Sequence, residues 1–245
     1  MRLPLSSAIV DRLDVLDETG STNAVLAERA RAGTEPEFSV VLTTNQTAGK
    51  GRLGRVWTAP PGKTIAVSVL LSPPDSTQLG WLPLIAGLAM TRAVRSLVSG
   101  HEVALKWPND VQVDGLKVSG LLAELVPGAG VVMGAGLNLT MDESELPTPV
   151  STSLTLVGAD PDGLVDRALA AYLRELKALY AGLLERRGVR AEVERECSTI
   201  GRRVRVELPG GDNLYGTATG LDDGGRLLVD GRPIGAGDVT HLRYE

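Results

Sequence analysis

The chain has 245 residues, of which 43% are hydrophobic and 22% charged, and its formal net charge is −5 at pH 7. This composition is ordinary for a folded globular protein, and the length allows one large hydrophobic core with a small appendage. The acidic balance excludes a protein whose whole surface is built to hold nucleic acid, so a local cluster of cations is expected to bind a small anion.

The N-terminal segment, residues 1–18, is too short for a helix-turn-helix module, so we expect neither DNA binding nor transcriptional repression. A polar cluster, Gly20-Ser-Thr-Asn23, follows and leads into a helix predicted over residues 24–32, which ends at a glycine. Ser21, Thr22 and Asn23 are typical of an N-cap. They also suit a polar ligand head group, because a helix N-terminus presents free N–H groups at the same place.

A basic, glycine-rich loop comes next, after a strand predicted over residues 38–44. From Gln46 to Trp57 it runs Gln-Thr-Ala-Gly-Lys-Gly-Arg-Leu-Gly-Arg-Val-Trp. Its glycines let backbone N–H groups approach a ligand and its cations attract anions, so it is a candidate phosphate cradle built from Gly49, Gly51, Gly54, Lys50, Arg52 and Arg55. A Rossmann fold and a P-loop are excluded, because two prolines at positions 60 and 61 prevent the required helix and Trp57 stands at the first glycine position of a P-loop. From the motif alone, a solvated basic hairpin remains the alternative.

The middle of the chain predicts a largely antiparallel meander. Strands are expected over residues 65–71, 101–106, 111–113, 117–126 and 131–139. A core helix over residues 79–98, with Gly100 as its C-cap, interrupts them, and Asp114-Gly115 is typical of a two-residue hairpin. Four polar residues fall at strand ends or in the first hairpin, where one face would carry two ammonium groups, an amide and a carboxylate: Lys106, Asn109, Asp110 and Lys117. Surface charge and turn chemistry are the alternative for these four.

The C-terminal third changes character at about residue 198. Apolar residues at helical spacing predict a long helix from Asp160-Pro161 to near Gly188, and a short helix over residues 191–197. From Arg202 onward, short alternating strands with turns at 209–212, 222–225 and 231–233 predict a small β-barrel of SH3-like size. We therefore expect an α+β protein with two domains, residues 1–198 and 199–245.

Six motifs in a fixed order strongly resemble those of biotin protein ligases, over nearly the whole chain. They are Gly20-Ser-Thr-Asn23, the loop from Gln46 to Trp57, Lys106-Trp-Pro-Asn-Asp110, Lys117-Val-Ser-Gly-Leu-Leu122, Gly134-Ala-Gly-Leu-Asn138 and Thr152-Ser-Leu154. The resemblance implies a mixed, largely antiparallel sheet with helices on one side, of the class II synthetase type, followed by an SH3-like barrel. It also implies an enzyme without a DNA-binding domain that joins biotin and ATP, with Mg²⁺, into biotinyl-5′-AMP. Such an enzyme then transfers biotin to one lysine of the carboxyl carrier domain of an acyl-CoA carboxylase.

The roles of individual residues follow from this resemblance. Biotin would be bound by Ser21, Thr22, Asn23, Gln46, Gly49, Gly51, Arg52, Lys117 and Gly120. ATP and the acyl-adenylate would be bound by Arg52, Arg55, Trp57, Asn109, Lys117 and Asn138. The catalytic residues would be Lys117, Arg52, Lys106 and Asp110, with Asp110 near Mg²⁺ and either Lys106 or Asp110 assisting deprotonation of the acceptor lysine. The family usually has arginine where this chain has Lys50, which keeps the charge but loses the planar bidentate fork.

Two other functions stay open at the level of sequence. A lipoate or octanoyl transferase of the related fold would need a long apolar channel, whereas the polar cluster of Ser21, Thr22 and Gln46 favours biotin. A module that binds RNA or protein without chemistry is disfavoured by an aromatic content of only 3%.

The scarcity of cysteine and histidine and the lack of long apolar segments predict the cellular compartment. Its one cysteine, Cys197, cannot form an internal disulfide, and its two histidines, His101 and His241, give no metal-ligand spacing. The N-terminus has no sustained apolar run, and no segment approaches the length of a membrane span. We expect a cytoplasmic protein that binds no membrane and acts as a monomer or a homodimer.

Overall fold

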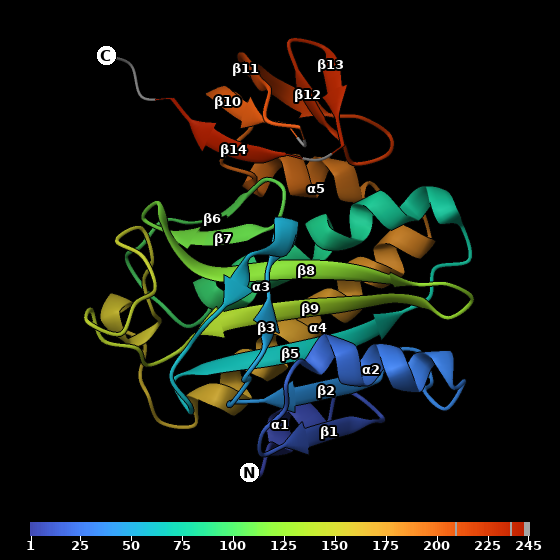
Figure 1. Ribbon diagram of the computed structural model, residues 1–245, viewed down its shortest axis with the longest axis vertical. Coiled ribbons are helices and arrows are strands. Elements are labelled where there is room, and N and C mark those ends of the chain that lie inside the picture. The colour runs from blue at the N-terminus through green and yellow to red at the C-terminus, as the bar shows by residue number, and fades with distance from the viewer. Residues whose placement is uncertain (209, 236, 243–245) are drawn as a thin grey trace.

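The structure is a computed structural model that describes residues 1–208, 210–235 and 237–242. At its centre lies a seven-stranded sheet with the strand order β1-β2-β5-β9-β8-β7-β6 (Figure 1). The strands are β1 (Leu13–Leu16), β2 (Val40–Thr43), β5 (Thr64–Leu71), β6 (Val103–Lys106), β7 (Asp110–Val113), β8 (Leu116–Val126) and β9 (Gly130–Asn138). Only β1 and β2 pair in parallel, so the predicted antiparallel meander is confirmed.

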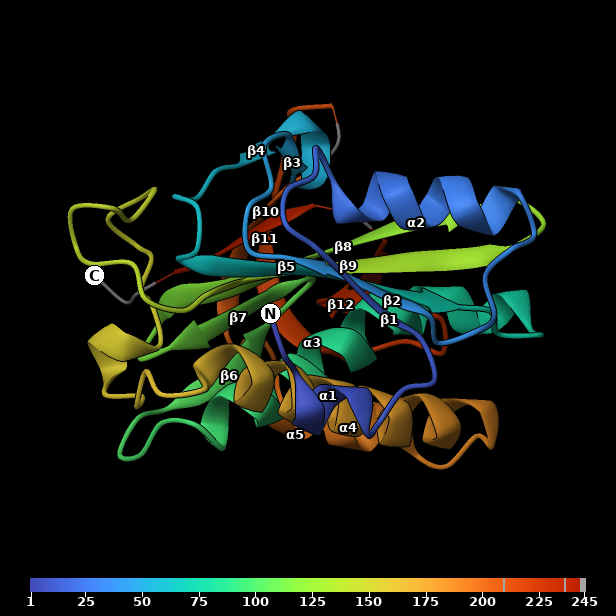
Figure 2. The same ribbon diagram turned by 90° about the horizontal axis from the view of Figure 1, so that it is seen from below.

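Helices cover both faces of this sheet to different extents. On one face lie α1 (Pro4–Ser7), α3 (Leu82–Arg95), α4 (Leu164–Leu184) and α5 (Val189–Glu196), and α2 (Thr22–Arg31) lies on the other (Figure 2). The strand residues explain this, because Val69 of β5 joins the large core with α3 and α4, whereas its neighbour Leu70 packs with Leu26 of α2. The predicted arrangement with helices on one side is confirmed for the long helices, and α2 adds a small second layer.

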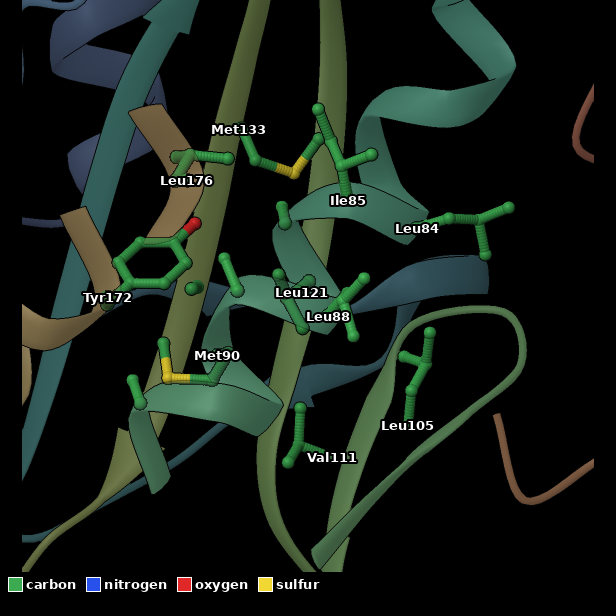
Figure 3. Packing of buried hydrophobic residues seen from close by; sticks show 14 of the residues in the cluster. Leu84, Ile85, Leu88, Met90, Leu105, Val111, Leu121, Met133, Tyr172 and Leu176 are labelled. Atoms are coloured by element: carbon green, nitrogen blue, oxygen red, sulfur yellow. The ribbon is translucent and has the colours of Figure 1, made fainter. Parts of the chain in front are cut away.

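The main core lies between the sheet and the pair α3 and α4. Leu84, Ile85 and Leu88 of α3 face strand residues such as Met133, and Tyr172 of α4 projects into the same layer (Figure 3). The Tyr172 side chain is fully buried, its hydroxyl has no hydrogen-bond partner, and burial raises the pKa of this phenol. A filled apolar layer on this face leaves the opposite face of β8 and β9 free to carry polar groups.

Several helix boundaries differ from the predicted ones, and local hydrogen bonds explain why. The segment predicted to begin α3 is instead a 3₁₀ helix, Ser76–Trp81, capped by Asp75, and the C-cap of α3 is Ser96 rather than Gly100. The Asp160 side chain accepts a hydrogen bond from the Asp162 N–H in a turn, which delays α4 to Leu164. Gly188 does not end α4, which stops at Leu184, but stands at the N-cap of α5.

A five-stranded antiparallel sheet with the order β13-β12-β11-β10-β14 forms the C-terminal part. Its strands are β10 (Arg203–Glu207), β11 (Asn213–Leu221), β12 (Leu227–Val229), β13 (Arg232–Ile234) and β14 (Asp238–His241). The turn predicted at 231–233 lies earlier, at Asp230 and Gly231, which both adopt positive φ angles, and Arg232 and Pro233 already lie in β13, an edge strand where proline is tolerated. Pro209 of the predicted turn at 209–212, and residues 243–245 of the predicted domain, lie outside the described residues.

The two sheets share one continuous core, since Val204 and Leu221 of the C-terminal sheet belong to the same buried cluster as α3 and α4. The domain boundary at residues 198 and 199 therefore stays a prediction. Among the described residues, none of the helices combines the length and the apolar character that crossing a bilayer requires.

Candidate active site

A cavity of about 450 Å³ opens above β8 and β9, on the face away from α3 and α4. Its walls come from the N-terminus of α2, the basic loop, the ends of β6 to β9, the segment 147–151 and strand β14. The basic loop forms a small hairpin, β3 (Gly49–Lys50) and β4 (Val56–Trp57), joined by a 3₁₀ turn over Arg52–Gly54. Figure 1 shows this hairpin standing on the sheet close to the C-terminal strands.

Nearly all the site residues predicted from the sequence line this one cavity. They are Ser21, Thr22, Asn23, Gln46, Gly51, Arg52, Arg55, Trp57, Lys106, Asn109, Asp110, Lys117, Gly120 and Asn138. Of the other predicted phosphate-cradle residues, Lys50 also lines the cavity, whereas Gly49 and Gly54 do not. Gly49 lies in the hairpin itself, where a Cβ atom would collide with the Trp57 carbonyl oxygen. The cavity wall also contains residues that the sequence did not single out, from the segment 147–151 and from β14: Pro147, Thr148, Val150, Ser151, Asp238, Val239 and Thr240.

One end of the cavity is neutral and rich in hydrogen-bonding groups. Ser21 is the N-cap of α2 as predicted, and its hydroxyl accepts a hydrogen bond from the Ala24 N–H at 3.4 Å. The Gln46 side-chain oxygen accepts from the Thr22 N–H at 3.0 Å and lies 3.3 Å from the Thr22 hydroxyl. The helix terminus and the start of the basic loop are therefore tied together at this end.

The other end gathers cations, three of which have a partner within the protein. Lys117 lies 2.6 Å from the Asp110 carboxylate, and Arg55 forms an ion pair with Asp238 of β14. Arg52 donates to the Asn109 side-chain oxygen at 3.1 Å and to the Gly237 carbonyl oxygen at 3.4 Å. Positive charge is thus concentrated at this end but partly neutralised by groups of the chain itself.

Burial lowers the pKa of two of these cations. Desolvation lowers the pKa of Lys106, with the Asp110 carboxylate acting in the opposite direction and the Lys117 ammonium adding to the fall. Desolvation also lowers the pKa of Arg52, again opposed by Asp110. An arginine with a depressed pKa remains charged at neutral pH, whereas a buried lysine loses its proton more readily than an exposed one.

Trp57 lies on a floor made of two glycines, Gly120 of β8 and Gly136 of β9, which face each other in the strand register. A Cβ atom on Gly136 would come within 2.5 Å of the indole, and one on Gly120 within 3.2 Å. Lys117 lies over the same indole, with its ammonium 5.9 Å from a ring centroid. The two glycines therefore make the space that the indole occupies.

Two buried polar atoms of the cavity wall have no hydrogen-bond partner. The Asn138 amide donates to the Thr152 carbonyl oxygen at 2.9 Å, but its side-chain oxygen accepts nothing. The indole N–H of Trp57 is also without an acceptor. Because orphaned buried polar groups are costly and rare, both atoms indicate a ligand that offers a donor and an acceptor.

The cavity offers a metal ion two carboxylates, those of Asp110 and Asp238. Within the described ranges, no group of three or more His, Cys, Asp or Glu side chains is placed to hold a metal. Mg²⁺ does not need such a cage, because it is commonly bound by one or two carboxylates together with substrate phosphates. Asp110 at the cationic end fits that use.

Known protein families match most of the chain. Residues 15–138 match the Biotin/lipoate A/B protein ligase family, and residues 199–242 match the Biotin protein ligase C terminal domain.

Individual relatives agree with this. The chain is 42% identical to the biotin--[acetyl-CoA-carboxylase] ligase of Mycobacterium tuberculosis, covering 95% of this chain and 90% of the relative. It is 30% identical to the bifunctional ligase/repressor BirA of Escherichia coli, over 88% of this chain and 68% of that protein. Among solved structures, the biotin protein ligase of Aquifex aeolicus in complex with biotin and ATP superimposes with a TM-score of 0.74 at 27% identity, covering 96% of this chain and 100% of the other.

Proposed function

The chain belongs to the biotin protein ligase family, and we propose that the cavity above β8 and β9 holds biotin and ATP side by side for two successive reactions. In the first, biotin and ATP form biotinyl-5′-AMP and pyrophosphate. In the second, the biotinyl group passes to a lysine of a carboxyl carrier domain. Because the Mycobacterium tuberculosis relative is named for acetyl-CoA carboxylase, we propose a carrier domain of an acyl-CoA carboxylase as the acceptor.

The two ends of the cavity support this placement of the substrates. The neutral end, with Ser21, Thr22 and Gln46, suits the ureido ring of biotin, which bears both N–H donors and a carbonyl acceptor. The cationic end suits the biotin carboxylate and the α-phosphate. The adenine base would lie near Trp57 and Asn138, whose orphaned N–H and oxygen would then find partners.

The first reaction requires two anions to meet. A carboxylate oxygen of biotin attacks the α-phosphorus, the new C–O–P linkage forms, and the bond to pyrophosphate breaks. Arg52 and Lys117 neutralise the approaching carboxylate and phosphate, and Arg55 neutralises the phosphate oxygens once it leaves Asp238. Removing one such fixed positive group costs about 3 kcal/mol of transition-state stabilisation in a water-excluded site. The hairpin over the cavity would keep water from the reactive mixed anhydride.

Mg²⁺ would enter with the nucleotide. Asp110 would contribute a carboxylate oxygen and the phosphates the rest, and the ion would supply additional positive charge to the departing pyrophosphate. Asn109, which is held by the Leu121 carbonyl oxygen and by Arg52, would orient the nucleotide beside it.

The second reaction needs a neutral amine. The acceptor lysine attacks the biotinyl carbonyl carbon, an amide bond forms, and AMP leaves. Lys106 is the better placed of the two groups that would take up the amine proton, because burial lowers its pKa and Asp110 is assigned to Mg²⁺ in this proposal. The single cysteine is free and buried, which fits a reducing compartment, so we place the reaction in the cytoplasm.

The observation that carries the proposal is that one cavity brings together neutral hydrogen-bonding groups, the cations Lys117 and Arg52, and the unpaired polar atoms of Trp57 and Asn138. Biotin-dependent exchange of labelled pyrophosphate into ATP tests it, with lipoate as the competing substrate. We expect exchange with biotin and none with lipoate. Exchange with lipoate alone would instead identify a lipoate ligase, and an avidin blot of candidate carrier domains then tests the transfer step.

A further inference from the structure

Four side chains behind the neutral end form a continuous hydrogen-bonded chain. The Asn23 amide donates to Glu124 of β8 at 2.6 Å and to the Leu122 carbonyl oxygen at 3.3 Å. The buried hydroxyl of Ser68 on β5 lies 2.6 Å from the Asn23 side-chain oxygen and 2.8 Å from the Thr22 hydroxyl. Thr22 lines the cavity, so the chain runs from a carboxylate on β8 to the cavity wall.

The direction of this chain is fixed at the Asn23 end. A carboxylate and a carbonyl group only accept hydrogen bonds, so the Asn23 amide must turn its NH₂ group toward Glu124 and Leu122. Its oxygen must therefore face Ser68. Gly134 provides the space for this amide, because a Cβ atom there would collide with the Asn23 side chain.

The positions of the Ser68 and Thr22 hydroxyl protons follow from counting donors and acceptors. An amide oxygen only accepts, so the single hydroxyl proton of Ser68 goes to Asn23. The Ser68 oxygen is then left to accept from the Thr22 hydroxyl at 2.8 Å; the other acceptor near that hydroxyl is Gln46, at 3.3 Å. In either case the Thr22 proton is used within the protein, and Thr22 offers the cavity only lone pairs.

The neighbouring groups have the opposite polarity. Since the Gln46 oxygen accepts from the Thr22 N–H, the Gln46 NH₂ group is left to donate. The Ser21 oxygen accepts from the Ala24 N–H, so its hydroxyl proton is free to donate. The wall thus presents one acceptor beside donors, which complements the N–H and the carbonyl oxygen of a cyclic urea.

We propose that Glu124, acting through Asn23 and Ser68, is a positioning residue that fixes Thr22 as a hydrogen-bond acceptor and so selects a ligand with an N–H group at that point. The inference rests on the proposed binding of biotin in this cavity. It gives Asn23 a different role from the ligand contact expected from the sequence, because its NH₂ group is used by Glu124 and Leu122.

The test compares two ligands by calorimetry in the absence of ATP. One is biotin, and the other is a cyclic carbamate analogue in which an ether oxygen replaces one ureido N–H. The wild-type protein is expected to bind biotin at least about tenfold more tightly, because the analogue places a lone pair against the Thr22 lone pair. In Ser68→Ala and Glu124→Ala the fixed 2.8 Å acceptor of the Thr22 hydroxyl is lost or loses its polarity, and only the longer 3.3 Å contact with Gln46 holds the proton back. The hydroxyl can then turn and donate to the ligand, so the ratio of the two affinities should fall at least about threefold toward one.

Controls separate polarity from simple loss of packing. Glu124→Gln keeps an oxygen that accepts from Asn23 and should restore the wild-type ratio. Glu37→Ala and Ser39→Ala remove a carboxylate that accepts from Tyr180 and a buried hydroxyl that donates to Pro36, both away from the cavity, and should leave the ratio unchanged. The KM for ATP should stay constant in all folded variants.

The outcomes are distinct. If Ser68→Ala or Glu124→Ala weakens the binding of biotin and of the carbamate equally, the row of hydrogen-bonded side chains has only a structural role and the proposal is wrong. If both variants keep the wild-type ratio, it is also wrong. If the wild-type protein binds neither ligand, the proposed function itself fails. Thermal melting identifies a variant that does not fold, and the ratio of affinities measured for the other variant then tests the proposal.

Discussion

The two ends of the cavity are built on different principles. At the neutral end, polar groups are held by buried hydrogen bonds with one fixed polarity, anchored on α2, β5 and β8. At the cationic end, Lys117 and Arg55 are paired with Asp110 and Asp238, and these partners must give way when an anionic ligand enters. The neutral end is therefore prepared before the ligand arrives, whereas the cationic end exchanges internal partners for ligand atoms.

The largest effect should come from removing cations. Arg52→Ala and Lys117→Ala are each expected to lower the rate of biotin-dependent pyrophosphate exchange by about 10²- to 10³-fold, because each removes fixed positive charge where two anions react. Calorimetry with biotin alone should still detect binding to Arg52→Ala through the intact neutral end. Normal exchange in both variants would show that the cationic end has been wrongly placed.

Ionic strength should separate the two ends next. Raising the salt concentration from about 0.1 M to 1 M shortens the screening length from about 10 Å to about 3 Å. The KM for ATP should then rise several-fold, since its phosphates meet partly exposed cations, while the Kd for biotin should rise less, because biotin brings only one carboxylate to these cations. Equal salt dependence of both constants would remove the distinction between the ends.

A smaller effect is expected at the partner of Arg55. Asp238→Asn frees this arginine without changing the size of the side chain, so the phosphates no longer compete with a carboxylate. Because exposed ion pairs contribute about 0.2–1 kcal/mol, the KM for ATP should fall by about twofold to fivefold. An increase would mean instead that the pair mainly holds the hairpin in place, and Asp212→Asn serves as a surface control.

The smallest effect should be a pH dependence of stability at His241. Its ring nitrogen lies 3.0 Å from the Thr199 hydroxyl, and burial, together with the nearby cations Lys106 and Arg202, lowers the pKa of His241 from 6.5 to about 4. Above pH 6.5 the imidazole is neutral in the folded and unfolded states, so its contribution is complete. Between pH 6.5 and 4 the unfolded chain binds a proton that the folded protein excludes, and stability falls as the pH drops.

Urea unfolding at several pH values measures this contribution. His241→Asn keeps a polar group opposite Thr199 but does not titrate, so its stability should fall less steeply than that of the wild-type protein between pH 6.5 and 4. Parallel curves would show that other groups cause the acid sensitivity.

The sequence predicted the elements that depend on local chemistry. Asp114 and Gly115 both adopt positive φ angles, as a two-residue hairpin requires, and the strands that they join were expected. The short strand β13 was missed because its proline suggested a turn, and the start of α4 because a turn at Asp160 resembles a helix cap. These errors arise where several local structures suit the same residues.

The residues of the cavity could be predicted only in part, because some of them carry no local signal. Most of its lining residues lie in motifs, but Ser68 sits in a continuous apolar strand and Glu124 in an ordinary alternating one, and neither stands out. Their importance depends on α2 lying across both strands. Asp238 and Gly237 reach the basic loop from the far end of the chain, 185 residues from Arg52 in the case of Gly237. No local pattern reports such a contact.

The facing pair Gly120 and Gly136 has a practical consequence for engineering. The floor of this hollow is the backbone of two paired strands, so the hollow does not close when neighbouring side chains repack. If adenine lies near Trp57 as we propose, shortening this side chain would turn the hollow into a slot suited to an enlarged purine analogue. The strands that carry the rest of the cavity would stay as they are, which makes this floor a starting point for a ligase that accepts a synthetic nucleotide.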